Sequence, residues 1–410
     1  MRCRACNNKL DFKIVDLGYT AISNELVSID RLKEKQNIYP LELYVCNECY
    51  LVQIGEQINP LEIFNKNYVY FSSTSAHWLK HAKLYTEEIV DKLNLTSKSL
   101  VVEIASNDGY LLRNFVKRGI SCFGIEPTEG TAKIALENGV ETLVEFFDSN
   151  LAKRLVKDGK QADLIIANNV MAHVPTINDF ALSFKKLLKP EGTVTIEFPY
   201  LLNMFEDIEF DTIYHEHYFY FSIFALAIVF NKHKLIIYDV DVLSTHGGSL
   251  RIYLTHKGNE LDKSSSREKV TNLIEREDKL GVNSLKYYDN FRSKTFNIKI
   301  NSIKFLLDRK LSNKKIVAFG AAAKGNTFLN YCGIKSDLID FVVDETEYKI
   351  GKYLPQSGIP IVNIDKLNEY RPDVIVILPW NHKNEIVKKI SYCKEWGAEL
   401  VTFIPKLEFH

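Results

Sequence analysis

The sequence predicts an α/β protein in three parts, whose central part is a domain built on a parallel sheet. Three observations lead to this prediction: two Cys-x-x-Cys pairs near the start, apolar strand segments that alternate with helical segments in the middle, and a second, shorter alternation at the end. Strands and helices that alternate along a chain form βαβ units, which build parallel sheets. We expect a metal-binding module at 1–64, a central domain at 65–260, and a helical linker with a smaller doubly wound domain at 261–410.

The composition is that of a folded protein without net charge. The 410 residues include 52 Lys and Arg against 52 Asp and Glu, and 46% are hydrophobic, which is ample for packed cores. Balanced charge, with no Lys or Arg cluster around the cysteines, favours a small-molecule substrate and argues against nucleic acid. No segment approaches the roughly 20 apolar residues of a membrane span, and no signal-peptide pattern precedes the first cysteine. We therefore expect no membrane partner and a cytoplasmic location.

Four cysteines predict a zinc site in the first part. They stand as two pairs, Cys3 with Cys6 and Cys46 with Cys49, and this spacing brings four thiolates to one tetrahedral zinc, about 2.3 Å from each sulfur. Disulfides are disfavoured, because thiols stay reduced in the cytoplasm. A module of this size has little core of its own, so the zinc is expected to be structural. The other three cysteines stand alone in apolar segments and receive no role.

The central domain is predicted from apolar segments that are each followed by a segment of helical periodicity. The strands are expected at 99–105, 121–127, 162–169 and 192–199. Two later β-rich segments, at 233–243 and 247–258, are expected to form an antiparallel hairpin at the edge of the sheet.

Residues 261–311 are charged and helical in pattern, and they predict long helices that join two globular parts. Strands expected at 314–320, 339–345 and 373–379 then form the second doubly wound domain.

The turn after the first central strand is the candidate cofactor loop. Glu103 ends the strand, and Ala105, Asn107 and Gly109 follow with the spacing of an acidic-x-Gly-x-Gly-x-Gly loop, in which small or turn-tolerant residues replace two glycines. With Tyr110, this strand-turn-helix segment can close around an adenosyl cofactor. The loss of the glycines argues against a dinucleotide, whose pyrophosphate needs them.

Polar residues at the ends of later strands complete the expected cofactor site. Glu126 follows the second strand, where its carboxylate can accept hydrogen bonds from both ribose hydroxyls. Asn168 and Asn169 stand at the carboxyl end of the third strand, and ligands bind at that edge of open α/β sheets.

The segment Thr212 to Tyr220, TIYHEHYFY, holds four aromatic residues, two histidines and a carboxylate. Core packing alone is disfavoured, because burying these polar groups together costs free energy unless they pair or take part in chemistry. A metal site is also disfavoured: in a strand His215 and His217 share one face and Glu216 points away, so a metal would need other ligands. We expect a reactive site in this segment, in which His215 receives no role.

The ordered set of motifs resembles the sugar C-methyltransferases that use S-adenosylmethionine on nucleotide-linked keto-deoxysugars. The motifs are the paired cysteines, FSSTS, EIASNDGYLL, NNVMAHVP, YHEHYFYFS, HGGSLR and GAAAKGNTFLNYCGI, and they span essentially the whole chain. The resemblance implies a class I methyltransferase domain between an N-terminal zinc-binding module and a C-terminal Rossmann-like domain. It also implies methylation of a sugar carbon, C3, beside a C4 ketone.

Methylation next to a ketone needs a base for the α proton and a donor for the enolate oxygen. From the family pattern, His217 is the expected base, because a neutral imidazole has a suitable pKa. Tyr214 would donate to the developing oxyanion, and Glu216 would orient the base or bind the sugar. By resemblance, two more groups complete the pocket: Tyr70, with Tyr68 as a competitor for its position, and His173.

Two segments are candidate sites for the phosphates of the substrate. HGGSLR contains Ser249 and Arg251, whose guanidinium can grip a phosphate bidentately; a tight hairpin is the alternative, which would explain the glycines but not Arg251. GAAAKGN places Lys324 at a strand-to-helix turn, where a helix N-terminus favours negative charge, and tight helix-strand packing is the alternative.

Two other classes stay open. An O- or N-methyltransferase acting on another small molecule would use the same cofactor fold with a different pocket. A zinc-ribbon scaffold for nucleic acid or a protein partner is the non-enzyme alternative.

Overall fold

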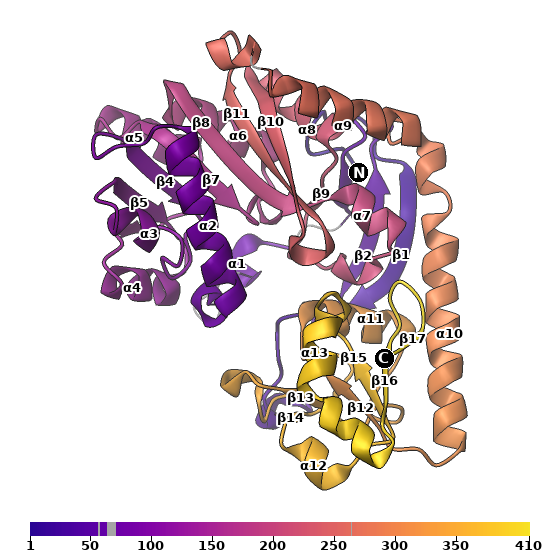
Figure 1. The fold of residues 1–410 in the computed structure, drawn as a ribbon. Coiled ribbons are helices and arrows are strands. Elements are labelled where there is room, and N and C mark those ends of the chain that lie inside the picture. Colours follow the sequence, from indigo (N-terminus) through magenta and orange to yellow (C-terminus); the bar gives the residue numbers. More distant parts are fainter. Residues whose placement is uncertain (56–57, 64–70, 264) are drawn as a thin grey trace.

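A computed structural model describes residues 1–55, 58–63, 71–263 and 265–410 of the chain. It contains three sheets, one in each of the predicted parts. The N-terminal strands β1 and β2 lie between the central and C-terminal domains (Figure 1). The long helix α10 runs along one side of the molecule from the central domain to the C-terminal domain (Figure 1).

The N-terminal sheet is antiparallel and receives its last strand from far along the chain. β1 (Phe12–Thr20) pairs with β2 (Tyr39–Val45), which pairs with β3 (Val52–Ile54). β9 (Phe219–Tyr220), at the end of the segment rich in aromatics and histidines, then pairs with β3. The module with the cysteines is therefore built into the same sheet as the candidate reactive segment.

The central sheet has seven strands in the order β10-β11-β8-β7-β4-β5-β6. Its parallel strands are β4 (Leu100–Ile104), β5 (Ser121–Ile125), β6 (Thr142–Leu143), β7 (Ala162–Asn168) and β8 (Leu188–Pro199). The antiparallel edge consists of β10 (Leu235–Leu243) and β11 (Ser249–His256). The four predicted strands and the edge hairpin are confirmed.

Helices of the central domain begin and end where local chemistry favours it. They are α1 (Pro60–Ile63), α2 (Ala76–Lys92), α3 (Arg113–Val116), α4 (Glu129–Glu137), α5 (Ser149–Lys157), α6 (Ile177–Leu187), α7 (Leu201–Glu206) and α8 (Ile223–Lys232). Asp148 caps α5 by accepting hydrogen bonds from the N–H groups of Asn150 and Leu151. In α6, apolar residues recur every three or four positions and are buried, so this helix covers the sheet with one face.

The predicted linker consists of α9 (Arg267–Leu280) and α10 (Phe291–Leu311). Glu277 of α9 is buried, and its carboxylate accepts hydrogen bonds from the N–H groups of Ile223 and Phe224 at the start of α8. Because these are backbone groups left unpaired at a helix start, the contact anchors α9 on the central domain. The connection between the domains is then made by α10.

The C-terminal sheet has the order β14-β13-β12-β15-β16-β17, parallel except at β17. Its strands are β12 (Ile316–Phe319), β13 (Val342–Asp344), β14 (Ile361–Asn363), β15 (Val374–Ile377), β16 (Glu399–Thr402) and β17 (Glu408–Phe409). Its helices are α11 (Ala323–Cys332), α12 (Lys366–Tyr370) and α13 (Lys383–Lys389). The predicted second doubly wound domain is present.

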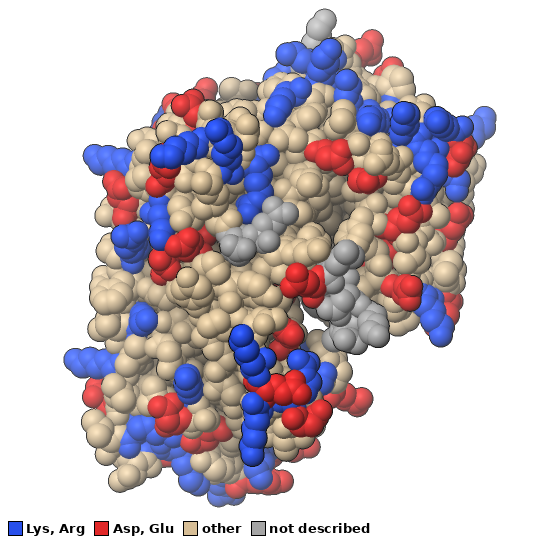
Figure 2. Space-filling view, turned by 180° about the vertical axis from the view of Figure 1, so that it is seen from behind, with Lys and Arg blue, Asp and Glu red and all other residues tan. Residues whose placement is uncertain are grey.

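Basic and acidic side chains are interspersed over the face shown in Figure 2, in line with the equal numbers of the two kinds in the sequence. Among the described residues, no helix is both long enough and apolar enough to cross a membrane.

Candidate functional site

A cavity of about 980 Å³ lies where the three parts of the chain meet. Residues at the carboxyl ends of β4, β5, β7 and β8 line one region of it, and residues 322–324 of the C-terminal domain line another. A loop of the N-terminal module and several residues between Thr212 and Phe221 complete the wall. Open parallel sheets bind ligands at the carboxyl edge of their strands, so the cavity lies where this fold predicts it.

The cofactor loop follows β4 in a left-handed backbone conformation. Ala105, Asn107 and Gly109 have φ values of 55°, 51° and 75°. A Cβ at Gly109 would lie 3.0 Å from the Val140 side chain, so glycine also serves close packing there. Of the predicted loop residues, Ala105, Asn107 and Tyr110 line the cavity.

The FSSTS segment closes over this loop. The N–H of Ser72 donates to Oδ1 of Asn107 over 2.9 Å, and the N–H of Ser73 donates to Oδ2 of Asp108 over 3.1 Å. The start of α2 is thereby tied to the loop, and Trp78 of α2 lines the same cavity.

Glu126 lies at the end of β5 and in the cavity wall, where a contact to the cofactor is expected. Its carboxylate accepts hydrogen bonds from the N–H groups of Asn107 (3.0 Å) and Thr128 (2.9 Å) and from the Thr128 hydroxyl, which fix its orientation. A carboxylate offers about four lone-pair sites, so acceptor capacity remains for about one ribose hydroxyl. Asn168 and Asn169 also line the cavity, and the Oδ1 atom of each is buried without a hydrogen-bond partner among the described residues. These donors and acceptors fit an adenosyl group.

Glu103 is placed differently from the expectation, because it lies outside the cavity lining. It is 1% exposed on β4, and its Oε2 atom has no hydrogen-bond partner among the described residues. Burial, and then the neighbouring charges of Asp108 and Glu126, raise the pKa of Glu103 well above its usual range. Its position suits a neutral group behind the cofactor loop.

The four cysteine sulfurs form one cluster. The Sγ atoms of Cys3 and Cys49 are 3.6 Å apart, those of Cys6 and Cys46 are 3.5 Å apart, and all four lie within 4.8 Å of one another. Tetrahedral zinc with bonds of about 2.3 Å requires sulfur separations of about 3.8 Å, which these distances match closely. Gln53 of β3 donates from Nε2 to the Cys3 sulfur over 3.2 Å. The cluster is the structural zinc site, and Gln53, which contacts it, lies on the strand that pairs with β9.

The segment from Thr212 to His217 is a turn, not a strand. A short 3₁₀ helix spans Phe210–Thr212, and β9 begins only at Phe219. Nδ1 of His217 lies 3.1 Å from the carbonyl oxygen of Thr212, and Nε2 lies 2.9 Å from the hydroxyl of Tyr214. Because a carbonyl only accepts, Nδ1 carries the proton of the neutral ring, and Nε2 accepts from Tyr214.

His173 is brought next to His217 by the 3₁₀ helix after β7. The two ring centres are 4.8 Å apart, and Nδ1 of His173 donates to the carbonyl oxygen of Glu216 over 2.8 Å. Burial lowers the pKa of His173 to about 4, so this ring is neutral at neutral pH. Tyr214, His217 and His173 therefore form one cluster in the cavity wall.

Glu216 and His215, the two residues before His217, lie in different surroundings. Glu216 lines the cavity, and its Oε1 atom accepts a hydrogen bond from Nδ2 of Asn24 over 2.7 Å. The ring of His217 is hydrogen-bonded to Tyr214 and Thr212, and these two residues orient it. His215 is fully buried, with Nε2 near the carbonyl oxygen of Pro40, and lies outside the lining.

Tyr70, and Tyr68 as its competitor, lie outside the described residues. Their expected role in the pocket stays a prediction from the resemblance.

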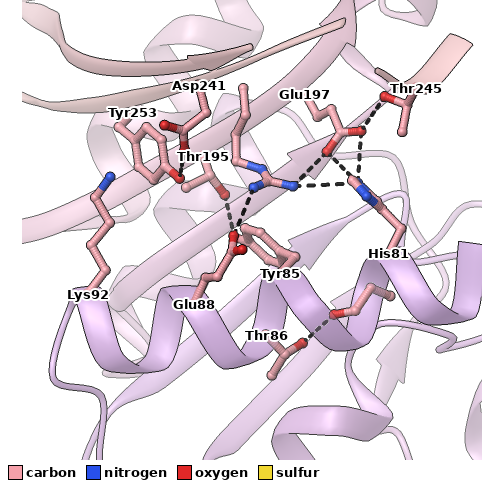
Figure 3. A network of polar contacts seen from close by, with 12 residues as sticks. His81, Tyr85, Thr86, Glu88, Lys92, Thr195, Glu197, Asp241, Thr245 and Tyr253 are labelled. Carbon is pink, nitrogen blue, oxygen red and sulfur yellow. Dashed lines mark hydrogen bonds and ion pairs between the residues drawn. The ribbon is translucent and has the colours of Figure 1, made fainter. Parts of the chain in front are cut away.

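Arg251 and Ser249 are placed away from the cavity lining. Arg251 is 2% exposed and donates to Oε2 of Glu197 over 3.1 Å, and Glu197 also contacts His81 of α2 over 2.9 Å (Figure 3). The Ser249 hydroxyl donates to the carbonyl oxygen of Thr245. The predicted phosphate grip does not form here, because β11 directs Arg251 to a buried carboxylate that the sequence pattern did not reveal.

Lys324, at the start of α11, does line the cavity. Its Nζ atom has no hydrogen-bond partner among the described residues and lies 4.9 Å from the centre of the Trp380 ring. Burial raises the pKa of Glu209 to about 7, and the charge of Lys324 opposes this shift. Asp211, which accepts a hydrogen bond from Nε1 of Trp380, is the second carboxyl near this lysine.

Sequence reasoning did not identify Asn24, Glu209 or Asp211. Asn24 stands in a polar loop without a motif. Glu209 and Asp211 immediately precede TIYHEHYFY, and their charges next to buried aromatic residues were the available signal.

Comparison with known proteins finds matches along most of the chain. Three family models match in order: a zinc binding domain at 3–64, a methyltransferase domain at 78–235 and a C-methyltransferase C-terminal domain at 244–405. The C-methyltransferase NovU of Streptomyces niveus is 28% identical over 404 residues, which cover 98% of this chain and 95% of that relative.

Solved structures of methyltransferases cover less than half of the chain. Magnesium protoporphyrin IX methyltransferase of Synechocystis PCC 6803 with bound SAH is 13% identical with a TM-score of 0.37, and covers 48% of this chain and 92% of that chain. An S-adenosylmethionine-dependent methyltransferase of Clostridium acetobutylicum ATCC 824 is 11% identical with a TM-score of 0.37, and covers 44% of this chain and 92% of that chain. Both scores lie below 0.5, and the fold assignment rests on the sheet order and the family models instead. With three domain models matched in order, a four-cysteine zinc site and a cofactor loop at the sheet edge, the chain is an S-adenosylmethionine-dependent C-methyltransferase with an N-terminal zinc-binding domain.

Proposed function

We propose that the enzyme methylates the carbon beside the ketone of a nucleotide-linked 4-keto-deoxysugar, at C3, through an enolate. The observation that supports this most is the cluster of His217, Tyr214 and His173 in the same cavity as the cofactor loop. This reaction needs a neutral base and an oxyanion donor side by side, and an imidazole with a phenol meets both demands.

His217 takes the α proton at Nε2, the ring nitrogen that carries the lone pair. In the described arrangement the Tyr214 hydroxyl donates its one proton to this nitrogen. When that hydroxyl donates to the ketone oxygen of a bound sugar instead, Nε2 is released for the α C–H group. The C–H bond breaks, its electron pair forms the enolate, and the charge on the oxygen is stabilised by Tyr214. S-adenosylmethionine, held by residues that include Glu126, Asn168 and Asn169, would supply the electrophilic methyl group for the enolate carbon, and its sulfur would keep the electron pair of the broken bond.

His173 supports this chemistry by staying neutral. A cation 4.8 Å away would disfavour protonation of His217, and the lowered pKa of His173 avoids that repulsion. Tyr70 is proposed, from the resemblance, to complete the same pocket.

The nucleotide part of the substrate is proposed to bind at the C-terminal side of the cavity. Lys324, Lys349 and Lys352 line this side, and the cavity has room for a ligand larger than a free sugar. Lys324 is the primary candidate for a phosphate contact, because its ammonium group lacks a hydrogen-bond partner among the described residues.

The test is a panel of nucleotide-linked 4-keto sugars incubated with S-adenosylmethionine that carries a ¹³C-labelled methyl group. We expect a product heavier by one methyl group, with a one-bond ¹³C–¹³C coupling between the new methyl and C3 of a ¹³C-labelled sugar. A new methyl group with no one-bond coupling to any carbon of a uniformly labelled sugar would indicate an O- or N-methyltransferase, and coupling to another carbon would contradict C3. Turnover of other small molecules but of no nucleotide-linked sugar would contradict the proposed substrate class.

A further inference from the structure

A side chain of the zinc-binding module reaches the reactive segment. Nδ2 of Asn24 donates to Oε1 of Glu216 over 2.7 Å, and both residues line the cavity. Glu216 is 3% exposed, so it is removed from bulk water, and Asn24 is its hydrogen-bond donor on the cavity side. The two residues are 192 positions apart in the sequence, and they meet because the zinc-binding module and the segment from Thr212 to His217 line the same cavity.

The C-terminal domain holds the loop that carries Asn24, through contacts both before and after this residue. It follows β1, and three of its residues contact the C-terminal domain. The contacts are the N–H of Ala21 to Oε1 of Gln356 (3.0 Å), the hydroxyls of Ser23 and Thr327 (3.3 Å), and the N–H of Val27 to the carbonyl oxygen of Tyr353 (2.9 Å). The amide of Asn24 is therefore presented by a fixed backbone, as a positioned donor requires.

Within the part of the chain that the structure describes, the side chain of Glu216 forms no ion pair, although Lys324, Lys349 and Lys352 line the same cavity. Burial raises the pKa of Glu216 to about 7, and the hydrogen bond from Asn24 opposes this shift. His173, which donates to the Glu216 carbonyl oxygen, is neutral because burial lowers its pKa to about 4. Burial raises the pKa of Tyr218 to about 12, so this neighbour is neutral as well. His217, next in the chain, bonds to Thr212 and Tyr214.

The guanidinium of Arg4, near Tyr218, is engaged elsewhere. Arg4 lies 5.9 Å from the centre of the Tyr218 ring and donates to the carbonyl oxygens of Ile54 and Gly55. The neutral amide of Asn24 is thus the group of the zinc-binding module that donates a hydrogen bond to the carboxyl group of Glu216.

We propose that Asn24 is a positioning residue for the methyl transfer, which holds the Glu216 side chain as an oriented carboxylate that accepts a hydrogen bond from the bound sugar. This inference rests on the proposed function. It gives the zinc-binding module a part in the reaction beyond folding, because a residue of that module sets the charge and direction of a group that faces the substrate.

The first test needs no substrate. Asn24→Asp exchanges the donor for an acceptor of the same shape, Asn24→Ala removes it, and Asn37→Ala, at an exposed position of the same module outside the cavity lining, is the matched control. The Glu216 carboxyl group is titrated in the free enzyme by infrared difference spectroscopy against Glu216→Gln. We expect its pKa to rise by about one to two pH units in Asn24→Ala, the effect of losing one hydrogen bond to a charged group. A larger rise is expected in Asn24→Asp, where two carboxyl groups compete for one proton.

The second test is the pH profile of kcat. Because a raised pKa reduces the carboxylate fraction at a given pH, the acid limb should move to higher pH in both Asn24 variants. The kcat at pH 7 should fall about 5- to 50-fold, with the profile of Asn37→Ala unchanged.

Two outcomes would overturn the role of Asn24 alone: an unshifted pKa of Glu216, or a shifted pKa with an unmoved acid limb. A wild-type enzyme that methylates no nucleotide-linked keto sugar would overturn the proposed function together with it.

Discussion

The buried pair of Arg251 and Glu197 allows a prediction that separates two possible roles of Arg251. The guanidinium and carboxylate are 3.1 Å apart, and their side chains are 3% and 0% exposed. If Arg251 is replaced by methionine, Glu197 keeps its charge but loses this partner. Removing one partner of a buried ion pair costs about 3 to 5 kcal/mol.

For a domain of this size, about 2 to 4 °C of melting temperature correspond to each kcal/mol, so Arg251→Met should lower the transition of the central domain by about 6 to 20 °C. The double variant Arg251→Met/Glu197→Met leaves no charge behind and should recover most of this loss. Differential scanning calorimetry resolves the transition. A single variant that melts within 2 °C of the wild type would refute the assigned pair.

The same pair predicts a pH dependence. Burial raises the pKa of Glu197, but the contacts with His81 and Arg251 outweigh it and hold the pKa below its usual range. A carboxyl group with a lowered folded-state pKa contributes stability above its unfolded pKa, about 4 to 5, and this contribution is lost as the pH falls through the folded-state pKa. The difference in the free energy of unfolding between the wild type and the double variant should therefore move against the wild type as the pH falls.

Arg251→Met should also leave KM for the nucleotide sugar unchanged when assayed below the transition, because Arg251 lies outside the cavity lining. A KM raised tenfold or more would instead restore Arg251 as a phosphate ligand.

Three further predictions concern the remaining sites. Glu126→Ala should weaken S-adenosylmethionine binding in calorimetry by about tenfold or more and leave nucleotide binding intact, since charged hydrogen bonds to ribose are lost; the reverse pattern would exchange the two sites. Lys324→Met should raise KM for the nucleotide sugar with little change in cofactor affinity, and an unchanged KM would remove its phosphate role. Removal of zinc by a chelator, or Cys46→Ser, should lower the melting temperature and abolish turnover, because β9 pairs with β3 of the zinc-binding module; full activity of a metal-free protein, checked by elemental analysis, would contradict this coupling.

Much of the fold follows from local patterns in the sequence. The strands around Val101, Phe123 and Ile165 are runs of β-branched and aromatic residues, and their burial on both faces of a parallel sheet explains why they could be predicted. The cysteine spacing was equally informative, because zinc imposes its geometry on any chain that supplies four thiolates.

Long-range pairing was not predictable in the same way. β9 is two residues long and joins a sheet whose other strands lie more than 160 positions earlier, so no local period marks it. Arg251 illustrates the same limit: its charge suggested a ligand, but its partner Glu197 lies on a different strand and is recognised only in the folded chain. Asn24 and Glu216 meet for the same reason.

The central claim is that His217 removes the α proton of the sugar, and proton exchange tests it most directly. The enzyme is incubated in heavy water with the keto sugar nucleotide and the demethylated cofactor product, and the C3–H signal is followed by NMR. The account predicts exchange with the wild type and a rate lower by about 10² to 10⁴ with His217→Asn, at unchanged cofactor affinity. Exchange by His217→Asn at the wild-type rate would contradict it.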